Sequence, residues 1–194
     1  TSNGLFLCGG WCSGNLLIND VKTEIEAVRQ QVEQFAALKA PCIVYAECSN
    51  TVQGNIAVPV NNRPKFAAAD VRAYGAKLSE LAKWMADQGM TLAYHHHMGA
   101  YVESPQDIDQ LMAVTDPAAV GLLFDTGHAY FGGAASPVDL LNTHVKRVVH
   151  VHCKDVRTPV IAQARNDGWS FLNGVINGTF TVPGDGSIDY AATL

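Results

Sequence analysis

Short apolar runs alternate with longer amphipathic stretches along the chain, and this alternation restricts the fold more than any other feature. Five apolar runs have the length of buried strands: Leu5–Cys8, Cys42–Ala46, Thr91–Tyr94, Val120–Phe124 and Arg147–Val151. Helices are expected at Val21–Lys39 and Phe66–Gln88, after Ser104-Pro105 and after Ser136-Pro137. An alternating strand and helix pattern predicts an α/β fold with a parallel sheet and right-handed crossovers.

The first helix shows the pattern on which these predictions rest. Apolar residues recur at spacings of three and four, at Val21, Ile25, Val28, Val32, Phe35 and Leu38. Asp20 is placed to cap its amino terminus. For the second helix, Gly89 is the expected stop signal.

The strands fit part of a closed barrel better than a dinucleotide-binding sheet. No strand is followed by a G-x-G-x-x-G turn, which removes the main support for a Rossmann fold. The chain starts without methionine, directly before a strand, and Ser187–Leu194 looks like the first turns of an unfinished helix. Five strand and helix units of roughly 35 residues make about five-eighths of a typical TIM barrel. We therefore expect one domain over residues 1–194, truncated at both ends, with long loops at Ser49–Pro64 and Asp155–Asp185.

Composition excludes several classes of protein. The 194 residues are 48% hydrophobic, enough for a real core, and the net charge of −5 argues against a nucleic-acid-binding surface. No apolar run reaches the roughly 18 residues of a membrane span, and no signal peptide opens the chain. Five cysteines without zinc-ribbon spacing favour a reduced, cytoplasmic protein. The sequence leaves the oligomeric state open, a homo-oligomer being one alternative.

Six of the seven histidines follow or end the last three apolar runs, at 95–97, 128, 150 and 152. Because the carboxyl ends of parallel strands meet at one rim, these side chains are expected to converge there. Imidazole together with carboxylate favours a divalent-metal site. Asp125 directly follows Val120–Phe124 and is the first candidate ligand, although it could instead cap the next turn.

Alternation within the strands selects among the histidines. His152 shares a strand face with His150 and lies nearer the rim, so it is the second candidate metal ligand. His95 and His97 also share a face, and one of them is expected to contact metal or substrate, whereas His96 faces the other way. Either histidine of a pair could instead be a hydrogen-bonded core residue.

Other residues at the same rim are candidates for catalysis or substrate binding. Glu47 ends a strand and could bind metal, act as a base or form an ion pair. Lys154 could contact a substrate hydroxyl or stabilise an enolate, or could simply be solvated. Trp11 and Tyr101, each close after glycine, are expected to form apolar walls of the pocket.

Taken together, three segments resemble the xylose-isomerase-like TIM-barrel superfamily, and within it the inosose dehydratases of inositol catabolism. They are Tyr94–Gly99, Leu123–His128 and His150–Arg157, with a later Gly-x-Gly loop at Gly184–Gly186. The resemblance covers essentially the whole chain and implies that it spans strands 3 to 7 of the barrel.

By this resemblance, Asp125 and His152 match the superfamily's metal ligands and His128 its substrate-binding histidine. Asp155 and Arg157 lie in a matching segment and are expected to contact substrate, a polyol ketone. His95 stands where the superfamily has a glutamate ligand.

The implied reaction is dehydration of 2-keto-myo-inositol to a trihydroxycyclohexane dione through a metal-stabilised enediolate, with Mn²⁺ or Co²⁺ favoured and Zn²⁺ or Fe²⁺ as alternatives. Glu47, His95 or His97 would be the base, and His128 or Lys154 the acid. The alternatives are a keto-sugar epimerase or isomerase of the same superfamily, or an inactive barrel fragment.

Overall fold

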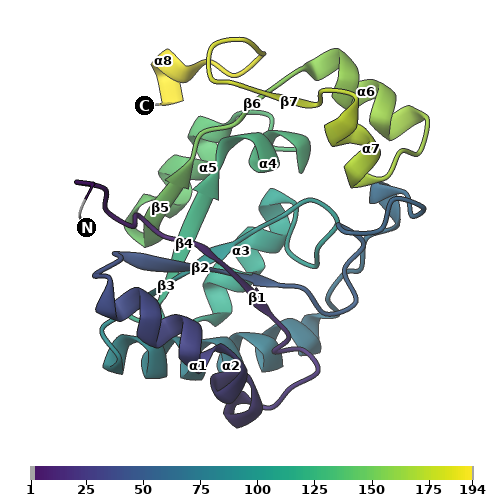
Figure 1. The fold of residues 1–194 in the computed structure, drawn as a ribbon. Coiled ribbons are helices and arrows are strands. Elements are labelled where there is room, and N and C mark those ends of the chain that lie inside the picture. Colours follow the sequence, from purple (N-terminus) through teal and green to yellow (C-terminus); the bar gives the residue numbers. More distant parts are fainter. Residues whose placement is uncertain (1–2, 194) are drawn as a thin grey trace.

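The computed structural model describes residues 3–193, and its centre is a parallel sheet with the strands in sequential order (Figure 1). The strands are β1 (Trp11–Gly14), β2 (Cys42–Glu47), β3 (Thr91–His95), β4 (Val120–Asp125) and β5 (Val148–His152). Every neighbouring pair is parallel. A doubly wound sheet would reverse its order at a switch point, whereas the wall of a barrel does not. The sheet is therefore an arc of a barrel with β1 and β5 at its edges, as the sequence predicted.

Helices follow the strands, and the longer ones cover the outer face of this arc. They are α1 (Val21–Ala37), α2 (Ala68–Asp87), α3 (Pro105–Val114), α4 (Thr126–Phe131) and α5 (Pro137–His144), with short 3₁₀ turns η1 (Val60–Asn62) and η2 (Val145–Arg147). Asp20 caps α1 by accepting from the Thr23 amide, and Ser104 begins α3 in a reciprocal capping box with Asp107. No described helix is both long and apolar enough to cross a membrane.

The two faces of the sheet bury different residues. On the outer face, Ile43 and Tyr45 of β2 join the main core with residues of α1, α2 and α3. On the inner face a small cluster forms from Cys42, Val44, Ala93 and Leu123. Because strand side chains alternate, this division fixes which rim residues point into the barrel.

The first strand lies later in the chain than its apolar run predicted. Residues 5–8 are not part of β1, and Phe6 is 89% exposed. The register pairs Trp11 with Val44, so the pairing with β2, which starts at Cys42, begins after residues 5–8.

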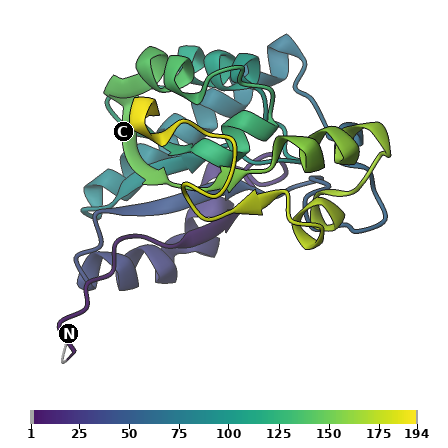
Figure 2. The ribbon, with the colours of Figure 1, turned by 90° about the horizontal axis from the view of Figure 1, so that it is seen from above.

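Residues 155–181 form a folded cap segment where the sequence predicted a loop, and that prediction was wrong. The cap segment contains β6 (Asp155–Val156), α6 (Thr158–Asn166), α7 (Phe171–Ile176) and β7 (Phe180–Thr181). β6 and β7 pair antiparallel, and Figures 1 and 2 show the segment beside α4 at one end of the sheet. The expected last helix begins as α8 (Tyr190–Thr193), while Leu194 lies outside the described residues.

Candidate active site

The last three strands bring their polar ends to one place on the inner rim. β3 ends at His95, β4 at Asp125 and β5 at His152, and the register places Asp125 opposite His152. Ala93 and Leu123, two residues earlier in their strands, belong to the inner cluster. Alternation therefore turns His95 and Asp125 inward as well.

The Asp125 carboxylate is the centre of this group, and it is fully buried. Its Oδ1 accepts from the His128 amide at 3.0 Å, which caps α4. Its Oδ2 faces the cationic and imidazole side chains: Lys154 Nζ contacts it, His152 Nδ1 lies at 3.3 Å and His95 Nε2 at 3.7 Å. Oδ1 thus accepts a backbone hydrogen bond, while Oδ2 faces the side chains that could take part in a reaction.

The nitrogens around Oδ2 are candidate ligands for a divalent ion. His95 Nδ1 contacts the His96 carbonyl and so carries the ring proton, which leaves the Nε2 lone pair facing Asp125. His152 Nδ1 is buried and has no well-formed hydrogen bond. Each of these two imidazole nitrogens faces the same carboxylate oxygen, and imidazole together with carboxylate suits a transition-metal ion.

His128 also belongs to the cluster, since ligand atoms of His95, Asp125 and His128 lie within 4.8 Å of one another. However, His128 Nδ1 accepts from the Met98 amide at 3.3 Å. In the neutral ring the other nitrogen then carries the proton. In this arrangement His128 is a hydrogen-bond donor toward the cluster.

The histidine run at the end of β3 divides its side chains between two directions, as its alternation predicted. The His97 ring lies 4.0 Å from the His128 ring and 5.4 Å from the His95 ring, measured between centroids. The His96 ring points away from the cluster, and its Nε2 accepts from the Asp125 amide at 3.3 Å. His96 thereby fixes the backbone of the carboxylate that the other rings surround.

Burial sets the charge states in the cluster. It lowers the pKa of His95 and His128 well below the usual 6.5, and the pKa of His96 and His97 to about 4. Burial works to raise the pKa of Asp125, but His128, His152 and Lys154 outweigh it and hold that pKa well below its usual value. At neutral pH these four rings are neutral and the carboxylate is ionised, which is the state that binds metal ions.

Aromatic side chains from distant segments wall the cluster. The ring of Trp11, on β1, lies 5.6 Å from His95 and 5.8 Å from His97. Phe171 contacts His97 and His128, and Phe180 contacts His128. The sequence suggested Trp11 but missed both phenylalanines, because they lie in the cap segment whose fold it did not predict.

Glu47 reaches the same rim but lies on the other face of the sheet. It follows Ile43 and Tyr45 in the outward alternation of β2. Its carboxylate accepts from the Leu17 amide at 3.2 Å and the Ser49 amide at 2.9 Å. The structure therefore does not bring Glu47 to the histidine cluster as the sequence suggested.

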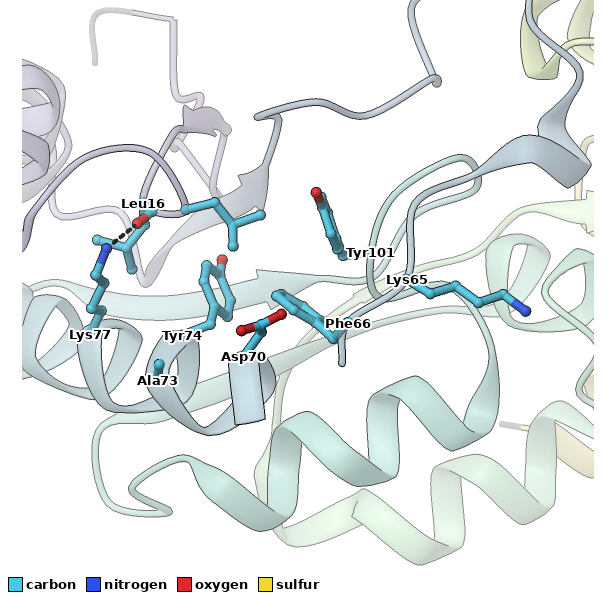
Figure 3. A pocket seen from close by; sticks show the side chains of 9 residues that line it. Leu16, Lys65, Phe66, Asp70, Ala73, Tyr74, Lys77 and Tyr101 are labelled. Carbon is cyan, nitrogen blue, oxygen red and sulfur yellow. Dashed lines mark hydrogen bonds between the residues drawn. The ribbon is translucent and has the colours of Figure 1, made fainter. Parts of the chain in front are cut away.

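Tyr101 lines a different hollow, a cavity of about 370 Å³ between the loop after β1 and the start of α2 (Figure 3). Its ring packs on Phe66 at 4.7 Å, and Phe66 packs on Tyr74 at 5.2 Å. The backbone bend at Gly99 (φ +79°) and the following turn lead the chain away from the cluster. Tyr101 is thus not a wall of the candidate site.

Asp155 and Arg157, expected to bind substrate, have their polar atoms engaged within the fold. The Asp155 carboxylate is buried and accepts from four amides, those of Val156, Gly184, Gly186 and Ile188. Arg157 donates to the Gly178 carbonyl, to Thr181 and to Asp185. Both residues tie the Gly-x-Gly loop to β6 and β7, a role that residue type alone does not reveal.

A comparison with protein families agrees with the geometry. The model of the xylose isomerase-like TIM barrel family matches residues 8–194. The chain belongs to this family. Its parallel five-stranded sheet forms part of the wall of such a barrel.

Sequence relatives support the same family, and a solved structure supports the same fold. The chain is 46% identical over 191 residues to the rhizopine catabolism protein MocC of Rhizobium meliloti, covering 98% of this chain and 58% of that protein. It is 42% identical over 155 residues to an inosose dehydratase of Clostridium botulinum, covering 79% of this chain and 52% of that enzyme. The chain thus spans a little over half the length of these relatives. The crystal structure of the IolI protein with a bound zinc atom superposes with a TM-score of 0.65 at 17% identity, covering 94% of this chain and 59% of that one.

Proposed function

We propose that this chain carries the active site of an inosose dehydratase, a hydro-lyase that removes water from 2-keto-myo-inositol to give a trihydroxycyclohexane dione. The observation that carries the proposal is the buried Asp125 carboxylate facing Lys154, His95 and His152 on the inner rim. The similarity to enzymes named inosose dehydratase supports the choice of substrate and reaction.

Asp125 Oδ2, His95 Nε2 and His152 Nδ1 would hold a divalent ion at this site. Manganese or cobalt is the proposed ion, with zinc or iron as alternatives, since all four accept nitrogen and oxygen ligands. The zinc atom in the IolI structure, whose fold this chain shares, supports a metal at the site. When bound, such an ion supplies a Lewis acid that polarises a ketone and makes the neighbouring C–H bond more acidic.

His97 is the proposed base. Its Nδ1 lies 2.8 Å from the Met98 carbonyl and so carries the ring proton, which leaves Nε2 with a free lone pair. Burial keeps the ring neutral by lowering its pKa to about 4. The Nε2 lone pair of His97 is therefore free to accept the proton from the carbon next to the ketone.

Lys154 is the proposed acid. Its ammonium contacts Asp125, and its side chain is about one-third exposed. A proton from Lys154 Nζ lets the hydroxyl on the next carbon leave as water. The C–H proton taken by His97 and the proton given by Lys154 balance the elimination, and proton return through water restores both residues. His128 donates a hydrogen bond to a substrate hydroxyl.

The test is an assay of the natural polypeptide containing these residues, with 2-keto-myo-inositol and Mn²⁺ or Co²⁺. We expect the ultraviolet absorbance of the dione to grow, and His97→Gln to slow it by about 10²-fold or more. His144→Gln is the matched control, because His144 pairs with Asp109 outside the cluster and its loss should leave turnover unchanged. An epimerised ketone in place of dione would assign the site to an isomerase, and no conversion would contradict the proposal.

A further inference from the structure

The loop that carries His97 is anchored by a buried acidic residue that no step of the proposed reaction uses. This histidine loop, residues 96–103, connects the end of β3 to the capping residue of α3. Its last residue, Glu103, has a side chain only 4% exposed. A buried carboxylate is costly unless its oxygens are paired, so its partners are informative.

Both oxygens of Glu103 are engaged, and they face in different directions. Oε2 accepts from the Gly99 amide at 2.7 Å, inside the histidine loop. Oε1 lies 3.4 Å from Arg63 Nε and 3.2 Å from Arg165 Nη2. The carboxylate therefore links the loop to η1 on one side and to the cap segment on the other.

The loop transmits this anchoring to the proton-transfer residues. The His97 amide donates to the Val102 carbonyl at 3.0 Å, and the Met98 amide donates to His128 Nδ1 at 3.3 Å. Gly99, the residue that Glu103 holds, lies at φ +79°, where a Cβ would come within 2.9 Å of the Gln53 amide nitrogen. The anchored residue is thus adjacent to the one that hydrogen-bonds to His128.

Arg165 extends the link to the helix that carries His128. Its Nη2 donates to the carbonyl of Phe131, the last residue of α4, at 2.8 Å, and its guanidinium lies 5.0 Å from the centre of the Phe131 ring. Its Nη1 donates to Asn61 at 2.7 Å. One carboxylate and one guanidinium therefore join the histidine loop, α4 and α6.

We propose that Glu103 is a positioning residue that sets the His97 and His128 rings relative to each other. This inference rests on the proposed function for its effect on turnover. The residues proposed to hold a metal lie on strands β3, β4 and β5, which hold their places through the sheet. Glu103 therefore governs the geometry of proton transfer and leaves the affinity for metal unchanged.

Glu103→Gln is the sharpest substitution because it keeps size and shape. A glutamine has one carbonyl oxygen, so its amide group must face either the Gly99 amide or the two guanidinium groups. In either orientation a donor meets a donor. Arg165→Gln is the second variant; it removes the partly exposed partner of Glu103 and is the gentler change for folding.

The matched control is Glu24→Gln, a second buried glutamate that is held by three neutral hydrogen-bond donors outside the cluster. Glu24 accepts from the Tyr45 hydroxyl at 2.7 Å, the Asn15 amide at 2.9 Å and the Asn19 side chain at 2.8 Å. It should lose thermal stability in the same way as Glu103→Gln, without disturbing either histidine.

The experiment combines histidine-ring NMR of the metal-free protein, Co²⁺ titration and steady-state kinetics. For Glu103→Gln we expect displaced His97 and His128 ring signals, Co²⁺ affinity within threefold of wild type, and kcat lowered by about 10- to 100-fold with little change in KM. Arg165→Gln should shift the same signals by less.

The NMR signals of the His97 and His128 rings test the positioning role of Glu103 even if the proposed function is wrong. A wild-type protein without dehydratase activity would overturn the function, while displaced rings in Glu103→Gln alone would still support the positioning role. Unmoved His97 and His128 signals in both variants, with stability loss like that of Glu24→Gln, would overturn the inference.

Discussion

Replacing Asp155 by asparagine should destabilise the fold strongly, because its two oxygens share four backbone donors evenly. Oδ1 accepts from Val156 at 2.8 Å and Ile188 at 2.9 Å, and Oδ2 from Gly184 at 2.9 Å and Gly186 at 3.0 Å. Asparagine keeps one oxygen and turns an NH₂ group against the other two amides. Two hydrogen bonds to a charged acceptor are lost, each contributing roughly 1.5–3 kcal/mol.

We therefore expect Asp155→Asn to lower the free energy of unfolding by about 3–6 kcal/mol and Tm by roughly 6–24 °C. Asp185→Asn is the control within the same loop, because Asp185 pairs with Arg157 at the surface and should lose less than about 1 kcal/mol. Urea and thermal unfolding of both variants measure the difference. A loss below about 1 kcal/mol for Asp155→Asn would refute the reasoning, and Asp155 would again be a candidate for substrate binding.

The same comparison has a defined pH dependence. Burial acts to raise the pKa of Asp155, but the four amides outweigh it and lower that pKa. A carboxyl whose pKa is lower in the folded state stabilises the fold above its unfolded pKa, near 3.9, and loses this contribution as the pH falls through the folded pKa. The stability gap between wild type and Asp155→Asn should be constant above about pH 5 and shrink in acid.

Three further predictions follow from the site. Glu47→Gln should leave metal affinity and turnover unchanged and cost about 1.5–3 kcal/mol of stability, since both carboxylate oxygens accept from backbone amides on the outer face. Equilibrium unfolding and a Co²⁺ titration check this, and a loss of Co²⁺ affinity would place Glu47 in the metal site. Gly99→Ala should destabilise by about 2 kcal/mol, because φ is +79° and the Cβ would meet Gln53; calorimetry showing wild-type stability would argue against the described loop. Chelation of a metal held at about 100 times its Kd should lower the free energy of unfolding by about 2.7 kcal/mol, and a Tm unaffected by EDTA would speak against a metal bound to the folded state.

The sequence predicted the α/β fold, and the polar residues at the carboxyl ends of the strands, because both follow from local patterns. Periods of two and of three to four residues marked β2–β5 and the helices α1, α2, α3 and α5, and cap residues such as Ser104 marked their starts. The convergence of His95, Asp125 and His152 followed from parallel strands having their carboxyl ends together. Local patterns were sufficient for these features.

The remaining features depend on contacts between residues far apart in the chain. Glu47 was predicted at the correct rim, but its face depends on the strand alternation relative to the outer core. Phe171 and Phe180 reach His128 only because the cap segment folds back over the rim. Asp155 lies in a segment expected to bind substrate, but its carboxylate accepts from the amides of Gly184 and Gly186, which are far from it in the chain. Each case required the register or the tertiary packing, neither of which the residue pattern encodes locally.

A Co²⁺ titration followed by visible absorption tests most directly whether Asp125 and its neighbours form a divalent-metal site. We predict one equivalent bound with nitrogen and oxygen ligands, an affinity lowered at least 100-fold in Asp125→Asn and His152→Asn, and unchanged binding in His144→Asn. Wild-type protein that binds no cobalt, or Asp125→Asn that binds it as tightly as wild type, would contradict the account.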